Sequence, residues 1–221
     1  MRRAALLFLL AGCTEPASER DLADERLGSV ETVDYRFSSA GGLVHVRRST
    51  AEGLVLRPSC AEFSFTVERR TAVLMMLTVD LENVRPSLTL SGPIERVPLT
   101  DRWVLRFPPG VDRVEVSAEP QPPGDFSFLA FGDIQNGIGS FDDVVTKLNE
   151  HLDADFILFL GDATQSSEVG EFDAVEAAFD RIALPLFLTP GNHDVYQNTL
   201  FQQRFGRASY TCTHKGARFT S

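Results

Sequence analysis

Three short apolar runs in the second half of the chain, each followed by a glycine-containing turn, constrain the fold most. The runs cover residues 126–131, 156–160 and 184–188, and the turns after them read Gly132-Asp133, Gly161-Asp162 and Gly191-Asn192-His193-Asp194. Consecutive turns lie about thirty positions apart, the length of one strand–helix–strand unit. Continuous apolar runs are typical of parallel strands buried on both faces. Since parallel strands end at one edge, we expect two aspartates, an asparagine and a histidine to converge there.

The segments between the runs have the spacing of amphipathic helices. Ser140 followed by Asp143 has the pattern of a helix cap, and apolar residues recur after it at Phe141, Val144, Val145, Leu148 and Leu152. The next connection repeats the spacing at Phe172, Val175, Phe179 and Ile182. Two helices that alternate with three strands predict a βαβαβ unit.

The apolar period changes to two between residues 27 and 119. Phe63, Phe65 and Val67 alternate with polar neighbours, and Trp103 and Leu105 continue the same pattern. Further strands are predicted at 43–46, 72–77, 87–90 and 111–116, with glycine and proline turns between them. About seven short strands without a useful helix predict an all-β sandwich. Within it, we expect His45 to be an ordinary strand residue and Trp103 a core residue.

Residues 120–124 contain three prolines and no apolar residue outside them. Prolines at this density prevent regular structure, so we place a linker there. The predicted fold has two domains, a β-sandwich at 27–119 and an α/β domain at 125–221 with mostly parallel sheets and flanking helices.

The first residues predict export. Arg2 and Arg3 precede an apolar segment at 4–11, which is too short to span a bilayer. The sequence Leu10-Ala11-Gly12-Cys13 resembles the bacterial lipobox, which implies removal of residues 1–12 and lipidation of Cys13. Residues 13–26 then form a polar tether. The alternatives are an ordinary secretory signal with an incidental cysteine, or a wrongly assigned start.

Because Thr14 rather than aspartate follows Cys13, an outer-membrane anchor is favoured, facing the periplasm or the cell surface. The formal net charge of −10 excludes the basic surface expected of a nucleic-acid-binding protein. Exported proteins can keep disulfides. Cys60 and Cys212 nevertheless fall in different predicted domains, and we expect both to be free and buried.

Carboxylate, amide and imidazole groups at one sheet edge form a ligand set for Mn, Fe or Zn. The three turns in this order, with Gln135 two residues after Asp133, resemble the calcineurin-like metallophosphoesterases over residues 125–221. The resemblance implies a hydrolase with two divalent metal ions, which clamp a phosphate ester and activate a water molecule. The substrate would be a phosphorylated small molecule or a phosphodiester.

By position, the resemblance implies that Asp133 binds the first metal, that Asp162 bridges both metals, and that Asn192 binds the second. His193 would donate a proton to the leaving group, with Asp194 holding its ring. The alternative for all five residues is a purely structural role in turns and caps.

Two departures from the family pattern affect the expected activity. Gln135 stands where the family usually has histidine, and its amide oxygen is a weaker, neutral ligand. The later histidines of the family have no counterpart, because His214 is the one histidine after Asp194 and is expected in the turn of a hairpin at 208–220. We therefore expect the front part of a catalytic domain, truncated at its C-terminus, inactive as it stands and with an exposed apolar face. The alternative is a non-catalytic exported lipoprotein that binds through its sandwich, with a degenerate phosphoesterase domain.

Overall fold

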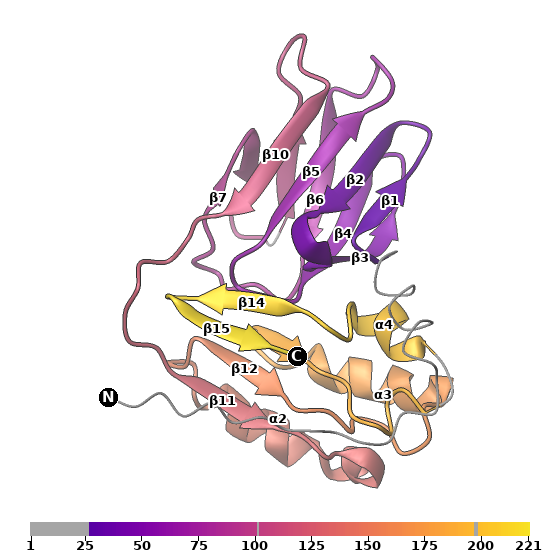
Figure 1. The fold of residues 1–221 in the computed structure, drawn as a ribbon, viewed down its shortest axis with the longest axis vertical. Helices are drawn as coiled ribbons and strands as arrows, with labels where there is room; N and C mark the ends of the chain where they lie inside the picture. The colour runs from indigo at the N-terminus through magenta and orange to yellow at the C-terminus, as the bar shows by residue number, and fades with distance from the viewer. Residues whose placement is uncertain (1–26, 101, 197–198) are drawn as a thin grey trace.

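The computed structural model describes residues 27–100, 102–196 and 199–221. A strand-rich N-terminal part stands on a second part made of strands and helices (Figure 1). The predicted signal peptide, Cys13 and the tether lie outside the described residues. Among the residues described, no helix is long and apolar enough to cross a membrane.

The N-terminal part contains two five-stranded sheets. The first sheet has the order β1 (Ser29–Glu31), β2 (Tyr35–Ser39), β5 (Ser64–Arg69), β10 (Arg113–Ala118) and β7 (Leu90–Ser91). The second has the order β3 (Val44–Ser49), β4 (Gly53–Pro58), β6 (Met76–Leu81), β9 (Arg102–Arg106) and β8 (Ile94–Arg96). Every neighbouring pair is antiparallel except β4 and β6, and a short 3₁₀ helix, η1 (Ala40–Gly42), connects β2 to β3.

Alternate side chains of both sheets form one apolar core. Phe65 and Val67 on β5 and Leu77 and Val79 on β6 belong to it, and so does Trp103, as predicted. Two sheets that share one core have the layering expected of a sandwich. The described strands number ten rather than about seven. The sequence analysis missed β4, for example, because Leu54, Val55 and Leu56 are all apolar and hide the alternate burial of the strand, and because Arg57 and Pro58 look like a turn although both are buried.

One predicted strand is largely wrong. Of the apolar run at 72–77, only Met76 and Leu77 lie in β6. Val73 and Met75 lie in the turn before it and are 84% and 56% exposed. The apolar character of this run therefore reflects burial at Leu77 but not at Val73 and Met75.

The C-terminal part is built on three parallel strands, β11 (Phe128–Phe131), β12 (Phe156–Phe159) and β13 (Leu186–Leu188), in that order. This confirms the predicted parallel arrangement. Phe159 packs on Phe179 of α3 (Val169–Phe179), with a ring distance of 5.1 Å, so the helices cover one face. Phe156 points to the other face, where its ring lies 5.4 Å from Phe219.

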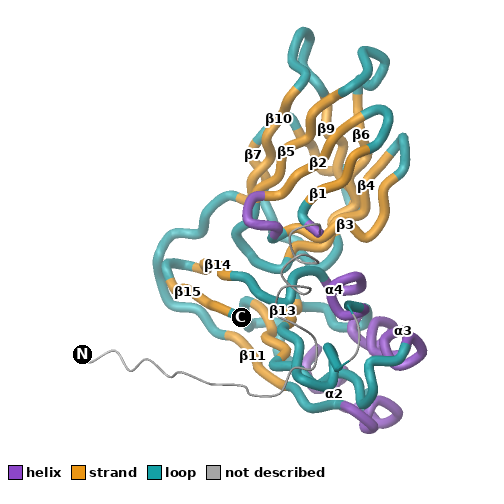
Figure 2. The backbone as a smooth tube through the Cα atoms, turned by 45° about the vertical axis from the view of Figure 1, so that its right-hand side comes forward, coloured by secondary structure: helices purple, strands orange, loops and turns teal. Residues whose placement is uncertain are grey.

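A hairpin of β14 (Thr211–His214) and β15 (Ala217–Thr220) lies beside the parallel sheet (Figure 2), and Phe219 on β15 packs on the face of Phe156. The predicted hairpin is confirmed, but its turn is Lys215-Gly216, with φ of 47° and 83°. Two positive φ values in succession suit a tight hairpin turn. His214 therefore lies in a strand and not in the turn. The hairpin covers much of the apolar face that the sequence analysis expected to be exposed, although Phe128 on the edge strand β11 stays 43% exposed.

The first predicted helix begins later than expected. Residues Gln135–Ser140 form a 3₁₀ helix, η2, and α2 (Asp142–Asn149) follows without a side-chain cap from Ser140. Its buried residues are Val145 and Leu148, whereas Val144 is exposed and Leu152 lies beyond the helix. In α3, Phe172, Val175 and Phe179 are buried as predicted. The last helix is α4 (Leu200–Phe205).

Polar contacts connect the two parts. The Asn83 amide nitrogen donates to the carbonyl oxygens of Pro58 and Leu186, both at 3.0 Å, and its oxygen accepts the Leu186 N–H at 2.6 Å. Arg85 donates to the backbone carbonyls of Asp155 and Ala154. The N-terminal sheets are thus bound directly to β13 and to the start of β12. Residues 120–124, the predicted linker, are exposed and in no helix or strand.

His45 on β3 is buried at this junction, where its Nε2 atom lies 3.0 Å from the carbonyl oxygen of Gln203. Burial lowers the pKa of His45 from 6.5 to about 4, the Gln203 contact opposes this, and Arg47 and Arg57 lower it further. The unfolded chain therefore takes up this proton at a higher pH than the folded chain. Folding stability that depends on neutral His45 is present above pH 6.5 and is lost as the pH falls towards 4.

We predict that His45→Gln reduces the loss of stability between pH 7 and pH 4, by up to about 3 kcal/mol. Glutamine keeps an N–H donor for Gln203 but takes up no proton. Urea unfolding at several pH values measures the difference. The exposed His151→Gln variant is the control and should retain the wild-type pH dependence. Equal pH dependence in all three proteins would contradict a buried, neutral His45.

Candidate active site

The three glycine turns follow β11, β12 and β13 at one edge of the parallel sheet. Asp133 and Asp162 occupy the same place in the first two turns, and both have φ of 60°. This left-handed conformation is uncommon for residues other than glycine, and residues held in it cluster at functional sites. The backbone of the first turn rests on the second, because Asp133 N–H donates to Gly161 O at 2.9 Å and Gln135 N–H donates to Asp162 O at 3.2 Å.

The second and third turns approach closely at Gly191. A Cβ atom at this position would lie 2.0 Å from Asp162 Oδ1, so the close approach requires glycine. The N–H of His193 donates to the same oxygen at 3.0 Å. Asp162 therefore contacts both neighbouring turns.

The structure brings the backbones of the predicted ligands together, but their side chains do not form a dense metal cluster. Asp133 and Asn192 are exposed, and Gln135 and Asp162 are partly buried. In the part of the chain that the structure describes, no three histidine, cysteine or acidic side chains are grouped as a metal site. Metal binding at this edge would depend on the amide oxygens of Gln135 and Asn192 as well as on the two carboxylates.

The ring of His193 is held by a backbone carbonyl. Its Nδ1 atom lies 2.7 Å from Gln165 O. Since a carbonyl oxygen can only accept, Nδ1 carries a proton, and Nε2 is the atom that remains for chemistry. The sequence analysis expected Asp194 to hold this ring, and the structure gives that contact to Gln165 instead.

Asp194 has a different role, because its side chain is fully buried and turned towards the loop after β12. Its Oδ1 accepts hydrogen bonds from the Thr164 N–H at 2.9 Å and the Thr164 hydroxyl at 3.1 Å, and Oδ2 accepts the Gly191 N–H at 2.9 Å. Burial raises the pKa of Asp194, although the N–H groups of Gly191 and Thr164 act in the opposite direction. Asp194 thus joins the second turn to the third.

Glu171 is a supporting residue that the sequence analysis missed. Its carboxylate accepts the N–H groups of Gln165, Ser166 and Glu168, each at 3.0 Å, and so fixes the segment that carries the Gln165 carbonyl. Burial raises the pKa of Glu171, but these three N–H groups outweigh it and the net pKa is lowered. A glutamate three residues after the helix-capping position Glu168 is the signal that could have identified it.

We predict that Asp194→Ala destabilises the protein by about 3 kcal/mol, because it leaves several buried donors without an acceptor. Chemical unfolding measures the effect. Asp143→Ala provides the control, since Asp143 is exposed on α2 and its removal should change the stability by less than about 0.5 kcal/mol. Similar stabilities for the two variants would show that the Asp194 contacts do not support the loops.

Comparison with known proteins supports the assignment of this region. No curated protein matches the chain. Residues 126–218 match the family model described as calcineurin-like phosphoesterase, which covers only part of the chain. Over these residues the chain is therefore similar to the calcineurin-like phosphoesterases, the family that its three glycine turns resemble.

Proposed function

We propose that the C-terminal part belongs to a metal-dependent hydrolase of phosphate esters, attached to a β-sandwich domain at 27–119 through the linker at 120–124. The observation that supports this most is the position of Asp162, which contacts the turns before and after it in the chain. The family match indicates phosphoester hydrolysis and the use of divalent metals. The proposed substrates include both phosphomonoesters and phosphodiesters.

The residues present fit a divalent metal through oxygen donors. Asp133 and Asp162 supply carboxylates, and Gln135 and Asn192 supply amide oxygens. Oxygen-only donor sets suit Mn²⁺ better than Zn²⁺, which prefers nitrogen and sulfur ligands. We therefore favour Mn²⁺ over Fe and Zn. When bound, the metal supplies the Lewis acidity that phosphoester hydrolysis requires.

We propose that His193 gives a proton to the leaving-group oxygen through Nε2. The Gln165 carbonyl holds the Nδ1 proton, so the ring has one fixed orientation. The backbone of His193 is also held, because its N–H donates to Asp162 Oδ1 at 3.0 Å. These contacts suit a general acid.

Mn²⁺ titration of the wild-type chain by calorimetry tests the metal site directly. We expect weak, saturable binding that is lost in Asp162→Asn, because the amide removes the central negative charge. Asp143→Asn is the matched control and should bind as the wild type does. Absence of saturable binding in a folded wild-type chain would contradict the proposal and favour the alternative, a non-catalytic lipoprotein in which the sandwich binds a partner.

Hydrolysis of p-nitrophenyl phosphate and its bis-ester with added Mn²⁺ tests turnover in the same proteins. The four oxygen donors are a sparse set for two ions, so we expect no measurable turnover by this chain. Metal-dependent turnover that disappears in Asp162→Asn would show that the ligand set is complete. This result would contradict the expected inactivity of the chain, but it would support the proposed hydrolysis of phosphate esters.

The Gln135→His substitution tests the first metal position. Imidazole is a stronger ligand than a neutral amide, so we predict a roughly tenfold tighter Mn²⁺ or Zn²⁺ affinity, equivalent to about 1.4 kcal/mol. Gln165→His changes a nearby side chain while keeping the backbone carbonyl that contacts His193, and it should leave the affinity unchanged. Equal affinities in Gln135→His and the wild type would show that residue 135 is not a ligand.

We further propose that the protein is exported and held at a membrane by lipid on Cys13, on the basis of the sequence Leu10-Ala11-Gly12-Cys13. Lipid chains supply the attachment in such proteins. Cys13→Ser should move the protein from the membrane fraction to the soluble fraction. Continued sedimentation of the variant with membranes after a high-salt wash would show that the attachment has another cause.

A further inference from the structure

Two cysteines from distant parts of the sequence meet at the junction between the N-terminal sheets and the hairpin. Cys60 lies just after β4 and Cys212 lies on β14. Both are free, and they are only 1% and 7% exposed. The Cys60 thiol donates to the carbonyl oxygen of Thr213, the residue after Cys212, with Sγ and O 3.7 Å apart.

The two thiols also interact with each other. A side-chain hydrogen bond between them lowers the pKa of Cys60, although burial raises it, and the same contact raises the pKa of Cys212. Burial raises the pKa of Tyr210, and negative charge on either cysteine raises it further. Glu62 is the other charged group near the pair.

The backbone around both cysteines is fixed. The N–H of Ser59, next to Cys60, donates to Leu43 O at 2.8 Å, and the Asn83 amide binds Pro58 O. On the other side, Cys212 is paired with Phe219 in the hairpin. Ordered segments on both sides therefore hold Cys60 Sγ against the backbone next to Cys212.

We propose that Cys60 and Cys212 form a disulfide that covalently joins the N-terminal sheets to the hairpin when the chain meets a small-molecule disulfide such as oxidised glutathione. The Cys60 thiolate attacks one sulfur of the oxidant and releases one thiol. The Cys212 thiol then loses its proton and attacks Cys60 Sγ, which releases the second thiol. One oxidant is reduced to two thiols, and the two cysteines become one disulfide.

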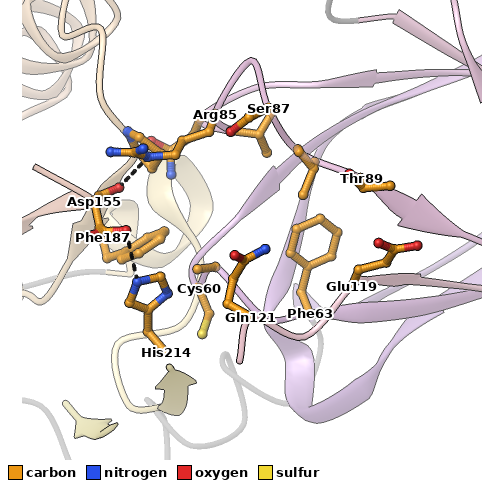
Figure 3. A pocket seen from close by; sticks show the side chains of 15 residues that line it. Cys60, Phe63, Arg85, Ser87, Thr89, Glu119, Gln121, Asp155, Phe187 and His214 are labelled. Carbon is orange, nitrogen blue, oxygen red and sulfur yellow. Dashed lines mark hydrogen bonds and ion pairs between the residues drawn. The ribbon is translucent and has the colours of Figure 1, made fainter. Parts of the chain in front are cut away.

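Cys60 stands beside a pocket in the folded chain. Cys60 lines a pocket of about 120 Å³ between the two parts, together with Phe63, Gln121 and His214 (Figure 3). The thiol of lower pKa is thus the one next to this pocket. That order suits Cys60 as the attacking thiol and Cys212 as the resolving one.

Such a bond would close a very long loop, since residues 60 and 212 enclose most of the described chain. Long loops restrict the unfolded chain most, so we expect the oxidised protein to melt about 10 °C above the reduced protein. The bond would also hold the hairpin over the Phe156 face of the parallel sheet.

The test treats the folded full chain with oxidised glutathione and maps its peptides by mass spectrometry without reduction. We expect a Cys60–Cys212 peptide pair, and melting curves should show the higher Tm before reduction and the lower Tm after it. Cys13→Ser should give the same pair and the same shift. Cys60→Ser and Cys212→Ser should show neither, and serine is close enough in size to preserve the fold.

Three results would overturn the proposal. One is glutathione attached stably to Cys60 or Cys212 without an internal bond. A second is a bond from either cysteine to Cys13 in place of the predicted pair. The third is that both thiols resist oxidation in the folded chain but react in the urea-unfolded chain, because the folded structure would then keep them apart.

Discussion

The buried Asp194 carboxylate is the contact on which the candidate site depends. It accepts hydrogen bonds from Thr164 and Gly191 and so joins the turn after β12 to the turn after β13. At the same point, Asp162 Oδ1 accepts the His193 N–H. A shift of either turn would therefore move the proposed ligand and the proposed acid together. The buried Asp194 side chain thus supports the turns that carry the residues proposed to contact substrate.

The N-terminal sheets act on the same strand. The Asn83 side chain donates to and accepts from the backbone of Leu186, which lies on β13. β13 leads into the turn that carries Asn192 and His193. The amide of Asn83 therefore helps to fix the first residue of the strand that precedes this turn. The N-terminal part is thus hydrogen-bonded to β13, the strand that precedes the third turn. A substitution at Asn83 can therefore shift the residues of that turn through β13.

The sequence could predict the three parallel strands because each is a continuous apolar run followed by a glycine turn. It could also predict which residues stand in those turns. It could not predict the role of Gln165, because a backbone carbonyl leaves no trace in residue identity. It also could not predict that Asp194 binds Thr164, because this contact depends on how the loop after β12 packs on the loop after β13. Residue patterns within one segment carry no information on such packing. The expected cap at Ser140 was wrong because η2 extends through that residue and delays the start of α2.

The left-handed conformation of Asp133 and Asp162 gives a separate reason to assign them a function. Glycine is the residue that adopts this conformation without strain, and aspartate tolerates it only at a cost of about 1 kcal/mol. For Asp162, the hydrogen bond from His193 offsets part of that cost. Among the described residues, no side-chain hydrogen bond or ion pair compensates Asp133, whose side chain is exposed at the sheet edge. An exposed carboxylate kept in this position agrees with the role proposed for Asp133 as a ligand of a divalent cation.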